Sequence, residues 1–155
     1  MTPTNNSDAV VIDASILVSM SSNEIGTHLA AEIAFNLYAQ NGWEFFAPNV
    51  VVAEVLFALC QKFASGILTQ SEYEQAIDDF LVLMKNISLE ADEKTLVKRA
   101  IEIRETYGCS RSSDSLYIAL AEDLAKSRTV EILTFDKGMI NQAAKNAPSV
   151  TIKIL

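Results

Sequence analysis

The pattern of apolar residues predicts five short strands separated by helices. Ala9-Val10-Val11-Ile12 is an apolar run rich in β-branched residues, which is typical of a buried strand. Similar runs predict four further strands at Glu44–Ala47, Ile87–Leu89, Glu131–Phe135 and Thr151–Ile154. Because helical segments separate the strands, the sequence predicts an α/β fold. We expect a three-layer sandwich with helices on both faces of a mostly parallel central sheet of about five strands.

The segments between the strands carry the spacing and the end signals of helices. Thr69-x-x-Glu72 is a capping-box pattern that predicts the start of one helix, and Gly66 is the expected stop of the helix before it. The predicted helices cover residues 13–20, 23–40, 48–64, 69–84, 92–107, 113–127 and 137–145.

Two of these helices have an apolar stripe that we expect to face the core. The stripe of the helix over residues 23–40 comprises Ile25, Leu29, Ile33 and Leu37. The stripe of the helix over residues 48–64 comprises Val52, Val55, Leu56, Leu59, Cys60 and Phe63.

Length and composition indicate an ordinary globular protein. The 155 residues fit one domain, which we expect to cover residues 9–155 after a flexible N-terminus at residues 1–8. Two cysteines outside any CxxC pair exclude a disulfide framework. The N-terminus lacks the features of a signal peptide, and no apolar run approaches the roughly 18 residues that span a bilayer. We therefore expect a cytoplasmic protein without a membrane partner.

The formal net charge of −8 at first argues against a nucleic-acid partner, because binding to phosphates normally needs a basic surface. The charge is unevenly distributed. Residues 1–61 contain six acidic residues and no Lys or Arg, whereas residues 62–155 contain all 12 basic residues and 14 acidic ones. The negative excess therefore lies mostly in the first part of the chain, where several acids interrupt apolar sequence.

Four of these acids are predicted to lie at one edge of the sheet. Asp13 and Asp136 directly follow predicted strands, Asp114 opens a helix, and Glu54 lies in the helix after the second strand. Sites in parallel sheets lie outside the carboxyl ends of the strands. Helix capping explains each aspartate singly. It explains neither their shared edge nor Glu54, which interrupts an apolar stretch.

Convergence of the four carboxylates would require a counter-charge. Two carboxylates about 5 Å apart repel by about 3 kcal/mol at an effective dielectric constant of about 20. A site with oxygen ligands alone selects hard divalent ions such as Mg²⁺ or Mn²⁺. Such ions activate water and stabilise the oxyanions of phosphodiester hydrolysis.

Other catalytic chemistries lack their residues. His28 is the single histidine, which excludes histidine-pair ribonuclease chemistry and three-histidine zinc sites within one chain. No serine has a histidine partner for nucleophilic catalysis. The glycine-rich loops of dinucleotide-binding and P-loop proteins are absent from the sequence. Metal chemistry at the carboxylates is what remains.

The four acidic segments resemble the four acidic motifs of the PIN-domain family, in the same order. The resemblance covers residues 9–155, and the spacing is similar to that of short bacterial VapC-type toxins. The matching segments are Val11-Ile12-Asp13-Ala14-Ser15-Ile16-Leu17, Val51-Val52-Ala53-Glu54-Val55-Leu56, Ser113-Asp114-Ser115-Leu116-Tyr117-Ile118-Ala119-Leu120-Ala121 and Leu133-Thr134-Phe135-Asp136-Lys137.

The resemblance implies a Mg²⁺- or Mn²⁺-dependent ribonuclease that acts on single-stranded or loop RNA, as the toxin of a type II toxin–antitoxin pair. It further implies a protein antitoxin and a homodimer. Asp13 and Asp114 would bind the metal directly, while Glu54 and Asp136 would bind a second ion or orient the water. Ser15 and Thr134 match small polar positions that support the first and fourth acids.

Basic residues lie next to two of the motifs. Arg111 lies three residues before Asp114 and Lys137 directly follows Asp136, so both are candidates for binding RNA phosphates.

Two alternatives stay open from the residues alone. One is a phosphotransfer or receiver-like Mg²⁺-binding domain, although Asp13-Ala14-Ser15 lacks the adjacent acid of such sites. The other is a catalytically silent protein-interaction domain whose aspartates cap helices.

Overall fold

The predicted α/β sheet is confirmed. The computed structural model describes residues 7–90, 93–105 and 113–155. Within this part, the strands are β1 (Ala9–Ile12), β2 (Glu44–Ala47), β3 (Ile87–Leu89), β4 (Val130–Thr134) and β5 (Thr151–Ile154). They form one sheet in the order β3-β2-β1-β4-β5, and all four pairs are parallel. β4 lies one residue earlier than predicted, and the other four strands have the predicted bounds.

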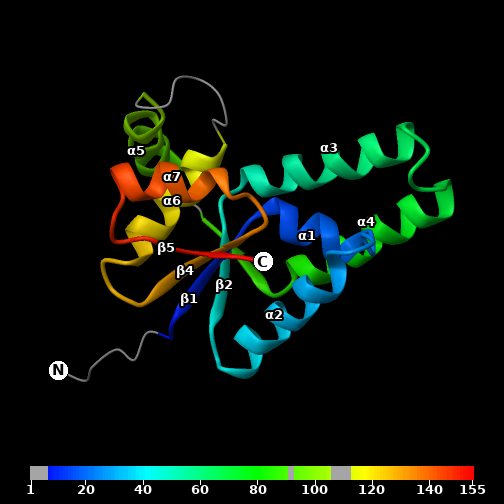
Figure 1. Ribbon diagram of the computed structural model, residues 1–155, viewed down its shortest axis with the longest axis horizontal. Helices are drawn as coiled ribbons and strands as arrows, with labels where there is room; N and C mark the ends of the chain where they lie inside the picture. Colours follow the sequence, from blue (N-terminus) through cyan, green and yellow to red (C-terminus); the bar gives the residue numbers. More distant parts are fainter. Residues whose placement is uncertain (1–6, 91–92, 106–112) are drawn as a thin grey trace.

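Helices cover both faces of the sheet. They are α1 (Ala14–Ser21), α2 (His28–Gln40), α3 (Val50–Ala64), α4 (Gln70–Met84), α5 (Glu93–Glu105), α6 (Asp114–Leu124) and α7 (Gly138–Asn146). In Figure 1, α5, α6 and α7 lie on one side of the sheet and α1 and α2 on the other, while α3 and α4 project as a hairpin. No helix in the described part of the chain has both the length and the apolar character needed to cross a membrane.

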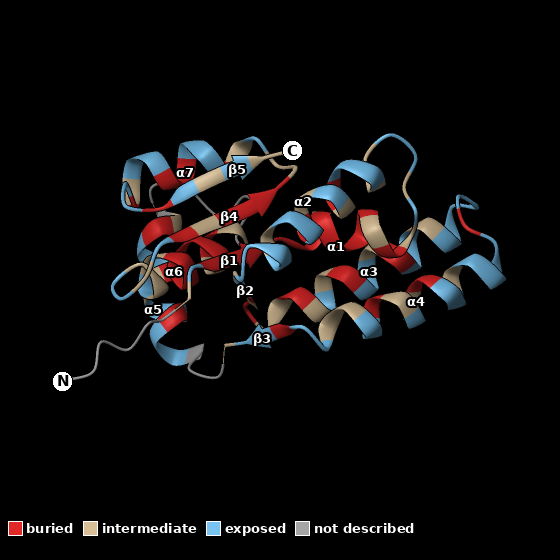
Figure 2. Ribbon diagram, turned by 90° about the horizontal axis from the view of Figure 1, so that it is seen from below, coloured by how far each residue is buried: buried red, intermediate tan, exposed pale blue. Residues whose placement is uncertain are grey.

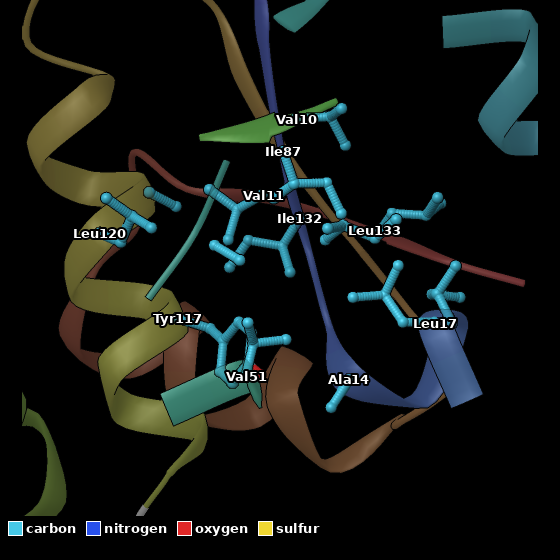
Figure 3. Close-up of a cluster of buried hydrophobic side chains, with 14 of the residues drawn as sticks. Val10, Val11, Ala14, Leu17, Val51, Ile87, Tyr117, Leu120, Ile132 and Leu133 are labelled. Atoms are coloured by element: carbon cyan, nitrogen blue, oxygen red, sulfur yellow. The ribbon is translucent and has the colours of Figure 1, made fainter. Parts of the chain in front are cut away.

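The core is centred on β1, the middle strand of the sheet. All four of its residues are fully buried. Residues 117–121 of α6 are also buried and pack toward β1 and β4 (Figures 2 and 3). The carboxyl end of β1 therefore lies in the best-packed part of the molecule, where side chains have little freedom to move.

α2 differs from the prediction in its start and in its buried face. It begins at His28 instead of Asn23, because Asn23 (φ 48°) and Gly26 (φ 89°) adopt left-handed conformations that cannot continue a helix. The stripe of Ile25, Leu29, Ile33 and Leu37 was expected in the core but is 57–96% exposed. The buried face is instead that of Ala31 and Phe35, and the Phe35 ring stacks on Phe45 of β2 with centroids 4.2 Å apart.

α3 also buries a narrower face than the sequence suggests. Val51, Val55 and Leu59 are fully buried where α3 packs against α1 and α4. Leu56, Cys60 and Phe63 were expected on the same face, but they are exposed. Helix α4, by contrast, begins with the predicted capping box, in which the Thr69 hydroxyl and the Glu72 carboxylate each accept the other residue's backbone N–H.

The expected flexible N-terminus falls largely outside the described residues, which begin at Ser7. The Ser7 carbonyl accepts a hydrogen bond from Arg128 (3.1 Å), and the Asp8 carbonyl accepts one from the Glu44 N–H (2.9 Å). These contacts hold the chain where it enters β1. The predicted helix end at Tyr107 and Gly108 also falls outside the described residues.

Two isoleucine substitutions test this placement of the helix faces. Ile16 of α1 is fully buried, so Ile16→Ala should lower the free energy of unfolding by about 2–5 kcal/mol. Ile33 of α2 is 61% exposed, so Ile33→Ala should change it by less than about 0.5 kcal/mol. Urea unfolding of the isolated protein measures both. Equal losses of unfolding free energy in the two variants would contradict the exposed position of Ile33 on α2.

Candidate functional site

The register of the two central strands places Asp13 beside Thr134. β1 and β4 are parallel with Ile12 opposite Leu133, so the residues that follow these two lie side by side. The Asp13 N–H donates to the Leu133 carbonyl at 3.0 Å and extends the ladder by one step. The first predicted acid therefore lies where the carboxyl ends of adjacent strands meet.

The Asp13 carboxylate is held by two hydroxyl groups. Its Oδ2 atom accepts hydrogen bonds from Ser15 Oγ and Thr134 Oγ1, both at 2.7 Å. Asp13 occupies the N-cap position of α1, but its side chain makes no capping hydrogen bond. The backbone N–H groups of Ala14 and Ser15 nevertheless lower the pKa of Asp13, so part of the capping explanation holds for this carboxylate.

Burial makes the ionised form of Asp13 unfavourable. The residue is only 7% exposed. Burial raises the pKa of Asp13 above its ordinary value, although the hydrogen bonds from Ser15 and Thr134 act in the opposite direction. When it is ionised, the carboxylate is a buried anion whose described hydrogen-bond donors are neutral, and a nearby cation would relieve this situation.

Asp136 joins the same network through Thr134. The Asp136 N–H donates to Thr134 Oγ1 at 2.9 Å, and the Phe135 N–H donates to Ser15 Oγ at 3.2 Å. The Asp136 side chain accepts the Gly138 N–H at 2.8 Å, at the start of α7. This last contact is a local turn of the kind that helix capping predicts. Helix capping therefore explains part of the role of Asp136.

Glu54 is held by a tyrosine that the sequence argument did not include. The Tyr117 hydroxyl donates to Glu54 Oε1 at 2.7 Å, which links α6 to α3. Tyr117 is fully buried, and its ring belongs to the cluster in Figure 3. Burial raises the pKa of Tyr117 far above its ordinary value, and the charges of Asp13 and Glu54 add to this effect. The hydroxyl therefore stays protonated and lies close to both carboxylates. The spacing of one helical turn between Asp114 and Tyr117 was the signal in the sequence that could have identified Tyr117.

Asp114 also has an amide partner that the sequence argument missed. Gln142 of α7 donates from Nε2 to Asp114 Oδ2 at 3.2 Å. Gln142 is 3% exposed, and its other polar side-chain atom, Oε1, is buried without a hydrogen-bond partner among the described residues. No sequence pattern singles out Gln142, because it lies 28 residues from Asp114 in a different helix.

Each of the four predicted acids accepts a hydrogen bond from a neutral donor, and the Thr134 hydroxyl brings Asp13 and the Asp136 backbone together. They do not form a preformed metal site, because no three acidic, histidine or cysteine side chains of the described residues are grouped closely enough to hold a metal ion. Lys137 is exposed at the N-cap of α7 beside Asp136. Arg111, the other predicted phosphate ligand, lies outside the described residues.

The donor set fits a hard divalent cation. Carboxylates supply only oxygen ligands, which Mg²⁺ and Mn²⁺ prefer. The unpaired Gln142 Oε1 beside Asp114 is a second observation in favour, because an unsatisfied buried polar atom often marks the place of a water molecule or an ion.

A groove beside the carboxylates opens this edge to solvent. Its walls come from α1, α3 and the segments that follow α1 and β4. The lining residues are Ala14, Ser15, Val18, Glu24, Thr27, Glu54, Ala58 and Phe135. Glu54 therefore faces both Tyr117 and the groove, as a residue at a binding site would.

The burial of the Asp13 carboxylate predicts how the stability of the protein depends on pH. Asp13→Asn should raise the unfolding temperature of the metal-free protein at neutral pH, because it removes a buried charge. The raised pKa means that the folded protein holds the Asp13 proton more tightly than the unfolded chain does. Wild-type stability relative to the variant should therefore fall as the pH rises above about 3.8 and level off beyond the folded pKa.

Thermal unfolding between pH 3 and pH 8 with a chelator measures this difference. Asp78→Asn, which changes an exposed residue of α4, is the matched control and should show little pH-dependent difference. A destabilised Asp13→Asn protein at neutral pH would contradict the prediction.

Comparison with solved structures shows the same fold in three proteins. VapBC2 from Rickettsia felis, bound to a DNA fragment from their promoter, has a TM-score of 0.58 at 12% identity, over 95% of this chain and 98% of that one. PAE2754 from Pyrobaculum aerophilum has a TM-score of 0.56 at 14% identity, and the match covers 86% of this chain and 84% of that one. FitAcB from Neisseria gonorrhoeae has a TM-score of 0.57 at 14% identity, and the match covers 92% of this chain and 95% of that one.

A search of curated proteins finds no match. The family model of the PIN domain, however, matches residues 10–146. This range contains all four acids, the strands β2, β3 and β4, and all of β1 but its first residue. The fold, the carboxylate edge and the family model agree, and the chain belongs to the PIN-domain family.

Proposed function

We propose that this protein is a Mg²⁺- or Mn²⁺-dependent endoribonuclease that hydrolyses phosphodiester bonds in single-stranded or loop RNA. The observation that carries the proposal is the set of hydrogen bonds by which neutral donors orient the four predicted acids. Membership of the PIN-domain family supports it, because PIN domains are generally nucleases.

The residues of the site have distinct roles in this proposal. Asp13 and Asp114 bind the cation directly, and Glu54 and Asp136 bind a second ion or orient the attacking water. Ser15 and Thr134 fix the orientation of the Asp13 carboxylate through their hydroxyls. A bound divalent ion would lower the pKa of a coordinated water and stabilise the charge that develops on the phosphate oxygens.

The groove is the proposed path of the RNA strand. Phe135 lines it next to the acids and offers a ring on which a base can stack. Lys137, exposed beside Asp136, binds a backbone phosphate in this proposal, and Arg111 is proposed to bind another.

A role as the toxin of a type II toxin–antitoxin pair is the second part of the proposal, with a protein antitoxin and a homodimer as partners. Structural likeness to VapBC2 and FitAcB supports it. The apolar stripe formed by Leu29, Ile33 and Leu37 of α2 and by Ile25 just before this helix is 57–96% exposed in the single chain. A protein partner that covered this stripe would remove a large apolar surface from water.

Metal binding gives the direct test of the site. Mn²⁺ or Mg²⁺ should raise the unfolding temperature, because a cation bound to the folded state alone stabilises it by about 2.7 kcal/mol at 100 times its dissociation constant. The wild-type protein should cleave structured RNAs with Mn²⁺ and not with a chelator. Asp114→Asn should abolish both the thermal shift and the cleavage.

Asp78→Asn, at an exposed position on α4, should keep both properties. A wild-type stability that is indifferent to millimolar metal would contradict the shared metal site. In that case a catalytically silent interaction domain would be the better reading, whereas a phosphorylated protein intermediate would favour a receiver-like domain.

Phosphate binding by Lys137 is tested separately from catalysis. Lys137→Ala should weaken binding of single-stranded RNA in a chelator and lower the slope of log affinity against log salt by about 0.7, the value for one phosphate. Metal affinity should be unchanged.

The matched control is Lys126→Ala. Lys126 is exposed just beyond the far end of α6, and that helix of 11 residues places it roughly 16 Å from Asp114. Equal RNA affinity of Lys137→Ala and the parent protein, in filter binding or fluorescence anisotropy, would reject the phosphate role.

A further inference from the structure

The Tyr117 hydroxyl is the one described side-chain partner of Glu54. Glu54 is the single charged residue between positions 50 and 61, on the apolar helix α3. Its carboxylate accepts one hydrogen bond from the described residues, at Oε1 from Tyr117 (2.7 Å). Its other oxygen, Oε2, has no hydrogen-bond partner among those residues. The direction of this carboxylate therefore depends on Tyr117.

The position of Tyr117 is rigidly set. The residue is fully buried in α6, one helical turn after Asp114, so both residues lie on the same face of that helix. A buried tyrosine hydroxyl needs a hydrogen-bond acceptor. Here the acceptor is a carboxylate 63 positions away in sequence, on a helix that borders the groove. A buried core residue thus holds a charged group at the edge of the site.

We propose that Tyr117 is a positioning residue for metal binding, and this inference rests on the proposed function. Its hydroxyl fixes Glu54 Oε1 and thereby keeps Oε2 available to a divalent cation. Groups that orient a ligand in this way typically change metal affinity by roughly 10- to 100-fold when they are removed. Tyr117 itself binds no metal and transfers no proton, because it stays protonated and buried.

The test is Tyr117→Phe, which removes the hydroxyl and keeps the buried ring. The dissociation constant for Mn²⁺, measured by isothermal titration calorimetry without RNA, should rise about 10-fold. Cleavage at limiting Mn²⁺ should fall, and raising Mn²⁺ to saturation should restore most of it. A residue that only stabilised the fold would not produce this dependence on metal concentration.

Tyr38→Phe is the matched control. Tyr38 of α2 also donates its hydroxyl to a glutamate, Glu131, near the amino-terminal end of β4 and away from the carboxylate edge. Removing this hydroxyl deletes the same kind of bond, yet Mn²⁺ affinity should stay within about two-fold of the wild type, since no candidate ligand is involved. Equal losses of affinity in both variants would show a general effect on the fold and overturn the proposal.

A double-mutant cycle adds a readout that needs no metal. In the metal-free protein, Tyr117→Phe should shift the urea midpoint less in a Glu54→Ala background than in the wild type, because the bond is already lost. Additive shifts would overturn the proposed coupling. If the wild type binds no Mn²⁺, the proposed function fails. If the wild type binds Mn²⁺ and Tyr117→Phe binds it equally well, the positioning role alone fails.

Discussion

The parallel pairing of β1 with β4 is the constraint on which the site depends. Ile12 lies opposite Leu133, so Asp13 and Thr134 lie side by side at the carboxyl ends of the two strands, and the Thr134 hydroxyl contacts both Asp13 and the Asp136 N–H. A slip of one residue would reverse the faces of a strand and separate this pair. Such a slip is strongly disfavoured because β1 is buried on both faces. The packing of the core thus sets the geometry of the charged edge.

Neutral donors then determine how the carboxylates are presented. A lysine or arginine ion pair would stabilise the folded protein, but it would also neutralise the negative charge that attracts a divalent cation. Hydroxyl donors orient Asp13 and Glu54 while leaving their negative charge in place. The raised pKa of Asp13 is the cost in stability of this arrangement. Loss of some stability in exchange for a prepared site is common in enzymes.

The sequence predicted the parts of the fold that depend on local pattern. Strand positions follow from short apolar runs, and the carboxyl-end rule predicted the position of Asp13 at the end of β1, where Thr134 of β4 contacts it. The convergence of all four acids stays a prediction. Helix faces were harder to predict, because α2 has two apolar faces and periodicity does not tell which one a neighbour covers. Tertiary contacts select the buried face, among them the stacking of Phe35 on Phe45 and the packing of α2 against α1. Tyr117 and Gln142 were missed for the same reason: their partners are 63 and 28 positions away.

The charge distribution gains a physical meaning from this arrangement. Four of the 20 acidic residues belong to the proposed site, and two divalent ions would reduce the net charge from −8 to about −4. The groove is lined by two acids, Glu24 and Glu54, and Glu24 is already paired with Lys62 at 2.7 Å. An RNA strand would therefore meet much less repulsion in the metal-loaded protein than in the free one. In the proposed enzyme, cation binding and substrate binding would therefore be coupled through this charge, because a bound cation would reduce the repulsion of RNA as well as activate the water.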